Sequence, residues 1–176
     1  MEVKTSVKTD QYQGHDYYQI DELLSHDHLL AREAVRAWVK QEVSPIIEDY
    51  SNRAECPTHL FKGLAEIGAF GPSLPVEYGG GGMDEIAYGV IMQELERGDS
   101  GVRSMASVHG SLVMFPIYKY AAENLRKKYL PKLGTGELIG CFGLTEPDHG
   151  SNPNGMVSKI VDDGDAYVLN GAKMWI

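Results

Sequence analysis

Residues 138–154 read LIGCFGLTEPDHGSNPN, and this stretch decides how the chain is divided. Leu138 to Leu144 is apolar and glycine-spaced, which predicts a short buried strand. Pro147 has no N–H and biases Glu146 toward extended geometry, so we expect the strand to end there. Asp148 to Asn154 is small and polar and predicts a loop whose backbone can approach another surface closely at Gly150.

This loop has two interpretations. Ser151 and Asn152 offer donors, and free loop N–H groups can accept an anion. A strand that delivers such a loop to a cleft can hold a flat polar ring and a phosphate. The same residues would equally form a tight turn between two strands, and the local pattern alone favours that turn.

Composition limits the class of protein. The chain has 176 residues, enough for one domain or one and a half, with 43% hydrophobic and 23% charged residues. Its 16 basic and 25 acidic residues give a net charge of −9, which argues against a nucleic-acid-coating surface but not against a small anionic ligand. Cys56 and Cys141 suggest neither a disulfide framework nor a zinc site. Without an apolar leader, a transit-peptide pattern or a membrane-length run, the sequence predicts a cytoplasmic protein.

Apolar periodicity upstream predicts five helices. Residues 1–20 are a polar lead-in, and residues 21–137 form the predicted α-helical domain. The helices are expected to begin near Ser25, Thr58, Asp84, Ser100 and Ala121, with an interruption at Pro45 and an end at Gly68.

Two polar features of the helices invite a functional hypothesis. His26 and His28 are two residues apart and do not share a helix face, so we expect solvated surface and no metal site. Arg103 and Ser104 lie in the first turn of the fourth helix. The guanidinium could meet Asp99 or Glu96 of the same chain, or an anionic ligand, and the residues alone favour the internal partner.

After the deciding stretch the period changes to two. Residues 157–162 and 166–169 predict two strands joined by a hairpin turn at 163–165, and residues 173–176 predict the start of a third. Helices followed by strands indicate an α+β chain, with residues 138–176 as the beginning of an antiparallel β-domain. Because three exposed strands are marginal alone, we interpret the sequence as a fragment of a longer protein.

The motifs together resemble the acyl-CoA dehydrogenase family. The segment Phe142-Gly143-Leu144-Thr145-Glu146-Pro147, followed by Gly150-Ser151, resembles the family's flavin-binding signature. The sequence NGAKMWI at 170–176 is similar to the next flavin-contacting strand, and residues 77–82, 128–133 and 136–138 match at the expected intervals. The likeness extends from about residue 20 to the end.

Within the family the likeness is closest to the glutaryl-CoA dehydrogenase branch. The segments that support it are 94–97, 99–101, 103–104, 111–114, 116–118 and 140–147. The resemblance implies that Arg103 and Ser104 contact the distal carboxylate of a glutaryl thioester, with Glu96 nearby. A guanidinium pairs with a carboxylate through two hydrogen bonds, and Glu96 would orient it. With the resemblance, a substrate carboxylate is favoured over an internal carboxylate as the partner of Arg103, although Arg103 can pair with each of them at different times.

The resemblance further implies non-covalent FAD and α,β-dehydrogenation of an acyl-CoA, followed in this branch by decarboxylation to crotonyl-CoA. A homotetramer and an electron-transfer flavoprotein as electron acceptor are expected. The catalytic carboxylate would lie in a C-terminal helical domain, so no catalytic residue is expected in this chain. Ser151 would also touch the thioester. The implied flavin contacts are Phe142, Gly143, Leu144, Thr145, Glu146, Pro147, Asp148, His149, Gly150, Ser151, Trp175 and Ile176.

The sequence departs from the family pattern at two places. Asn152 replaces the usual Asp after Gly150-Ser151, and Asp148-His149 replaces smaller or uncharged residues. Two rival readings also stand beside the main one. The first is an acyl-CoA oxidase, or a dehydrogenase for another acyl chain. The second is a non-catalytic helical binding module with no cofactor.

Overall fold

The structure is a computed structural model that describes residues 17–176. The predicted polar lead-in of residues 1–20 therefore lies outside the described residues, except for its last four. In chain order the described helices are η1 (Ile20–Leu23), α1 (His26–Trp38), η2 (Val39–Val43), α2 (Ile47–Asn52), α3 (Leu60–Glu66), η3 (Val76–Tyr78), α4 (Glu85–Gly98), α5 (Ser100–Ser107), η4 (Val108–Met114), α6 (Phe115–Tyr120), α7 (Glu123–Gly134) and η5 (Pro153–Gly155). The strands are β1 (Lys159–Asp162) and β2 (Tyr167–Asn170), so the predicted α+β class is confirmed.

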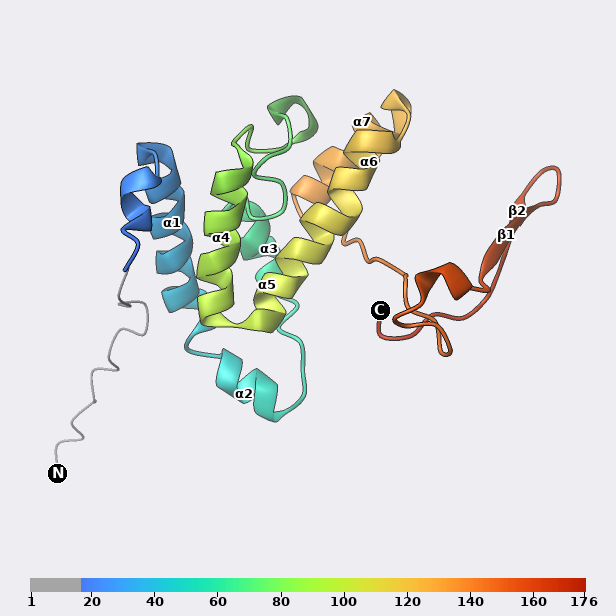
Figure 1. The fold of residues 1–176 in the computed structure, drawn as a ribbon, viewed down its shortest axis with the longest axis horizontal. Coiled ribbons are helices and arrows are strands. Elements are labelled where there is room, and N and C mark those ends of the chain that lie inside the picture. The colour runs from blue at the N-terminus through green and yellow to red at the C-terminus, as the bar shows by residue number, and fades with distance from the viewer. Residues whose placement is uncertain (1–16) are drawn as a thin grey trace.

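The helices form one region of the molecule (Figure 1). α1 lies alongside α4, and α4 meets α5 at a corner from which α5, η4 and α6 run on as one long helix. The buried carboxylate of Glu94 on α4 accepts two hydrogen bonds of 3.0 Å from the Arg36 guanidinium on α1. Apolar side chains from α1 to α7 form a single core, whose fully enclosed members include Val35, Val39, Val43, Leu64, Phe70, Leu95, Met114 and Leu130.

Most of the predicted helix signals are confirmed. Ser25 caps α1, with its hydroxyl accepting from the His28 N–H. Gly68, in the left-handed region at φ 72°, follows α3 and ends it. The first predicted helix is interrupted before Pro45, with the π-helical turn η2 ahead of the proline and α2 after it.

Three details of the helix prediction are wrong. His59, not Thr58, precedes α3. Asp99, not Ser100, caps α5, because the Asp99 carboxylate accepts from the Val102 N–H at 2.8 Å. His28 is buried rather than solvated, since α1 packs on α4 and its Nε2 lies 2.8 Å from the Asp84 carboxylate.

The segment 138–176 leaves the helices and contains a hairpin, after which the chain returns to the loop that precedes it (Figure 1). β1 and β2 pair antiparallel, from Lys159 opposite Asn170 to Asp162 opposite Tyr167. The predicted turn at 163–165 is confirmed, with Gly164 at φ 82°. All residues of both strands are exposed.

The predicted strands at 138–144 and 173–176 are wrong. A strand needs a neighbour to receive its backbone hydrogen bonds. Among the described residues no second strand lies beside Leu138 to Leu144, whose apolar side chains are partly exposed. The 173–176 segment makes one such bond, from the Met174 N–H to the Thr145 carbonyl at 2.9 Å. The division at residue 137 stays a prediction.

Candidate functional site

Of the four residues predicted to meet the substrate, Glu96, Arg103 and Ser104 gather at the corner between α4 and α5, and Ser151 lies in the 138–176 segment. Asp99 is extended and caps α5, so the chain changes direction there. This brings two residues seven positions apart into contact: Arg103 Nε donates to Glu96 Oε2 at 2.6 Å. Ser100 Oγ donates to the other carboxylate oxygen at 2.6 Å. Of the two internal partners considered for Arg103, the structure therefore has Glu96.

The ion pair at this corner is partly accessible to solvent. The exposed fractions of the Arg103 and Glu96 side chains are 34% and 47%. The hydrogen bond from Arg103, followed by that from Ser100, lowers the pKa of Glu96 from its ordinary value. Glu96 is thus held as a carboxylate that orients the guanidinium, while part of the guanidinium faces outward. Ser104 lies beside Arg103 on α5 and is half-buried.

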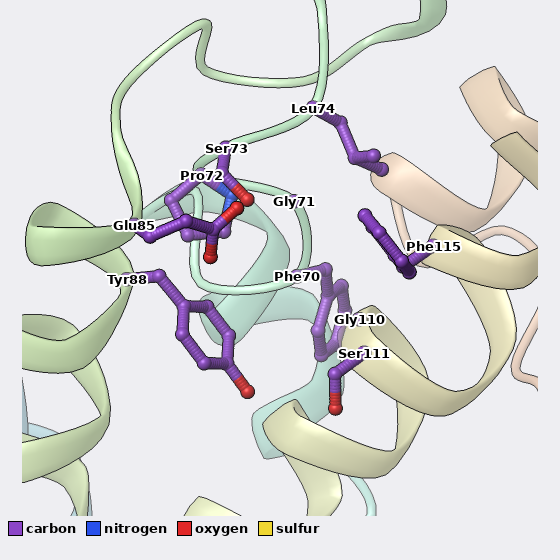
Figure 2. Close-up of a pocket in the computed structure, with 10 residues that line it drawn as sticks. All are labelled: Phe70, Gly71, Pro72, Ser73, Leu74, Glu85, Tyr88, Gly110, Ser111 and Phe115. Atoms are coloured by element: carbon purple, nitrogen blue, oxygen red, sulfur yellow. The ribbon is translucent and has the colours of Figure 1, made fainter. Parts of the chain in front are cut away.

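Sequence reasoning missed Ser107, which extends this group along the helix. Arg103 Nη1 donates to Ser107 Oγ at 3.1 Å, and Ser111 Oγ donates to the Ser107 carbonyl. The four-residue spacing of the three side chains was the available signal. Ser111 also lines a cleft of about 250 Å³ between α4 and η4 (Figure 2). The cleft has an apolar floor and a few polar groups, and its other lining residues include Phe70, Leu74, Glu85, Tyr88 and Phe115.

The residues predicted to meet a flavin lie in the segment 138–176 and are organised by one carboxylate. Glu146 is 2% exposed and accepts from the Val157 N–H at 2.7 Å and from the Ser158 N–H at 3.0 Å. Lys173 Nζ donates to Glu146 at 3.0 Å and to the Leu144 carbonyl at 3.0 Å. Hydrogen bonds from Ser158 above all, and then from Val157 and Lys173, lower the pKa of Glu146 to about 2.

The backbone turns tightly directly after Glu146. The Glu146 and His149 backbones exchange two hydrogen bonds, of 3.2 Å and 3.1 Å, with Pro147 and Asp148 between them. A tight turn is therefore present at 146–149, but it does not join two strands as the turn hypothesis expected. It sets Phe142, Gly143, Leu144 and Thr145 on one side and Gly150 and Ser151 on the other. The 142–151 segment is largely exposed, with the Glu146 side chain as its buried member.

The family follows from comparison with known proteins. Residues 25–137 match the model described as the acyl-CoA dehydrogenase, N-terminal domain. This chain belongs to the acyl-CoA dehydrogenase family. A probable acyl-CoA dehydrogenase of Bacillus subtilis is 37% identical over 155 residues, which cover 87% of this chain and 40% of that protein. Glutaryl-CoA dehydrogenase of Desulfococcus multivorans is 36% identical over 156 residues, covering 87% and 40% of the two chains.

A solved structure agrees with the acyl-CoA dehydrogenase assignment. Glutaryl-CoA dehydrogenase of Mycobacterium smegmatis, in complex with FADH2, superposes with a TM-score of 0.86 at 44% identity. The match covers 90% of this chain and 41% of that one. The chain thus spans about two fifths of the length of the acyl-CoA dehydrogenases that it matches.

The surface at the predicted flavin segment fits a flat, partly apolar ring with polar edges. Trp175 is 87% exposed and Phe142 is 42% exposed, so aromatic surface is open for stacking. Gly150 and Ser151 follow on the other side of the turn, where a Cβ on Gly150 would meet nothing nearer than 4.0 Å. A flat ring with polar edges can use both kinds of surface, and this segment offers both.

Within residues 17–176, no three His, Cys, Asp or Glu side chains gather as a metal site would require. In the same part of the chain, no helix combines the length and hydropathy needed to cross a bilayer.

Proposed function

We propose that the full-length protein to which this chain belongs is an FAD-dependent dehydrogenase of glutaryl-CoA that yields crotonyl-CoA by oxidative decarboxylation. The observation that supports the substrate is the partly exposed Arg103, held at 2.6 Å by Glu96 on the α4–α5 corner. Family membership and the open aromatic surface around Phe142 and Trp175 support the cofactor.

A dicarboxylic thioester explains a cation at this corner. A guanidinium presents several N–H donors in a fixed fork, and Arg103 Nε and Nη1 already engage Glu96 and Ser107. Its remaining donors can pair with the distal carboxylate, and the Ser104 hydroxyl lies next along α5. An uncharged acyl tail would instead displace water from the Arg103–Glu96 pair and offer no hydrogen bonds in its place, which is unfavourable.

Glu96 is assigned to orientation rather than proton removal. Its carboxylate accepts from Arg103 and Ser100, and these bonds lower its pKa. A general base works best when its pKa lies near the working pH, so a carboxylate stabilised in this way is a weak one. We therefore assign removal of the α-proton to a carboxylate outside this chain, in agreement with the family resemblance.

The 138–176 segment is assigned to cofactor binding. FAD, when bound, supplies the acceptor for the hydride that leaves the β-carbon of the substrate. Phe142 to Ser151 would hold its polar edge and pyrophosphate, Trp175 would pack beside the ring, and Ile176 would follow it. Ser151 would also touch the thioester. The ion pair between Glu146 and Lys173 joins the 142–151 segment to the 173–176 segment.

The remaining parts of the proposal come from the family resemblance. Electrons would leave through an electron-transfer flavoprotein, and the protein would assemble as a homotetramer in the cytoplasm. Size-exclusion chromatography with light scattering tests the assembly, and turnover with purified electron-transfer flavoprotein tests the acceptor.

Replacing Arg103 tests the substrate assignment. In the full-length protein Arg103→Leu should lower kcat/KM for glutaryl-CoA by about a hundredfold, the usual scale for losing a paired charge in a binding site. kcat/KM for butyryl-CoA should stay within about threefold, because that thioester has no distal carboxylate to lose. Arg53→Leu is the matched control, since Arg53 is a partly exposed arginine that pairs with Asp49 at 3.2 Å and with Glu55 at 3.4 Å, and not with Glu96.

Two outcomes would contradict the proposal. If Arg103→Leu lowers both activities equally, the carboxylate contact is wrong and a dehydrogenase for another acyl chain gains support. If the full-length protein is colourless and stays without flavin when FAD is added, the enzyme assignment itself fails, as the binding-module reading requires.

A further inference from the structure

His109 is a buried histidine that the proposed chemistry does not use. It lies on η4, is 1% exposed, and packs against the Phe70 ring with the ring centroids 4.3 Å apart. Its Nε2 is 2.9 Å from the Leu133 carbonyl on α7, and its Nδ1 is 3.1 Å from the Gly140 N–H. A carbonyl can only accept and an N–H can only donate, so the ring is the neutral tautomer with its proton on Nε2. Burial also lowers the pKa of His109.

The chain at Gly140 is in direct contact with the same helix. A Cβ on Gly140 would lie 2.5 Å from Val113 Cγ1, so the absence of a side chain lets the backbone rest on η4. Gly110, on η4 itself, makes a similarly close contact with the backbone of Phe70, because a Cβ on Gly110 would lie 2.2 Å from the Phe70 carbonyl oxygen. Figure 2 shows Gly110 beside Phe70 at the edge of the cleft.

The contacts of His109 connect the element that carries Arg103 to the chain that leads into the predicted flavin segment. α5 and η4 are one continuous helix, so His109 and Arg103 belong to the same element. Gly140 stands two residues before Phe142, where the predicted flavin segment begins. η4 is a π-helical turn, a widened turn that often marks a functional position in a helix.

We propose that His109 is a positioning residue that fixes the flavin segment relative to Arg103 through its hydrogen bond to Gly140. This inference rests on the proposed function, because the distance between the flavin segment and Arg103 matters only if the first binds the flavin and the second binds the substrate. Catalysis depends on that distance, since a misplacement of about 1 Å can lower a rate by about a hundredfold.

Three variants of the full-length protein test this role. His109→Leu removes both hydrogen bonds and should lower kcat by about tenfold or more for glutaryl-CoA and butyryl-CoA alike, with KM within about threefold. His109→Gln keeps one donor and one acceptor and should restore kcat to within about threefold of wild type. His28→Leu is the matched control: His28 is also buried with two partners, Ser25 and Asp84, but does not touch residues 138–144.

A readout that does not depend on bound flavin completes the test. Amide hydrogen exchange of residues 138–151 should be about tenfold faster in His109→Leu, because Gly140 loses its anchor, and unchanged in His28→Leu. Unchanged exchange in His109→Leu, or equal loss of kcat in His109→Leu and His28→Leu, would overturn the inference. Failure of the substrate proposal would appear separately, as an Arg103→Leu variant without selectivity.

Discussion

The helical region and the C-terminal segment are held together by different forces. Every buried apolar side chain of the described residues lies between Val35 and Leu133. In residues 138–176 the buried side chain is a carboxylate, Glu146, with Lys173 and two backbone N–H groups as its partners. One region is therefore stabilised by apolar burial, and the other by a local polar network under an exposed apolar surface.

This difference matches the roles proposed for the two regions. On the proposed function, the packed helical core would hold Arg103 in a fixed position, where it could bind the carboxylate end of a substrate. A polar network on an open surface leaves Phe142, Leu144 and Trp175 available to a ligand, since they are not used for packing. The comparison can be tested region by region.

The largest effect is expected from a cavity in the helical core. Leu64→Ala removes a side chain that is 0% exposed and should lower the free energy of unfolding by about 2–5 kcal/mol. Urea unfolding of the 176-residue chain, followed by far-UV circular dichroism, measures this loss. Leu125→Ala is the control, because Leu125 is 40% exposed, and a similar loss there would contradict the location of the core.

A more local effect is expected from Glu146→Gln. The amide keeps one acceptor oxygen but replaces the other with a donor facing the backbone N–H groups, and it loses the charge that pairs with Lys173. Amide exchange over residues 142–158 should become about tenfold faster or more, while exchange in α4 stays at its wild-type rate. If α4 loosens as well, the two regions are not independent.

The pH dependence of the C-terminal segment follows from the same carboxylate. The pKa of Glu146 is lowered from 4.5 to about 2 in the folded chain, so the ionised form favours the folded segment. Its stabilisation is complete above the unfolded pKa and is lost as the pH falls through the folded pKa. Exchange at 142–158 should therefore accelerate as the pH is lowered from about 4.5 to 2. This acid-induced change, after correction for intrinsic exchange, should be absent in Glu146→Gln.

The smallest effect is expected from a charge pair on the helical surface. Lys62 and Glu66 are 83% and 66% exposed and lie 3.8 Å apart. Lys62→Ala should change the free energy of unfolding by less than about 0.5 kcal/mol, because exposed pairs are screened by water. A change as large as that of Leu64→Ala would show that charge, rather than apolar burial, stabilises the helical region.

The sequence predicted local features better than distant contacts. The Ser25 cap, the Gly68 terminator and the turn at 163–165 depend on neighbouring residues and are confirmed. The network of Glu146 joins residues 11 to 27 positions apart, and no local pattern indicates it. The apolar run at 138–144 indicated a strand, but periodicity does not report whether a neighbouring strand exists to pair with it.

The same limit applies to the site. The pairing of Arg103 with Glu96 was among the options because both lie near the α4–α5 corner in sequence. His28 and His109 reach partners 56 and 31 residues away, Asp84 and Gly140, and their roles depend on how helices pack. The family resemblance supplied the flavin and substrate hypotheses, which residue patterns alone left open.

The most direct test of the account is anaerobic addition of glutaryl-CoA to the purified full-length protein while the visible flavin absorption is recorded. The account predicts that the wild-type protein is yellow, and that glutaryl-CoA bleaches its flavin absorption stoichiometrically with release of carbon dioxide. In Arg103→Leu the bleaching should be far weaker. A protein without flavin, or a flavin that butyryl-CoA reduces but glutaryl-CoA does not, would contradict it.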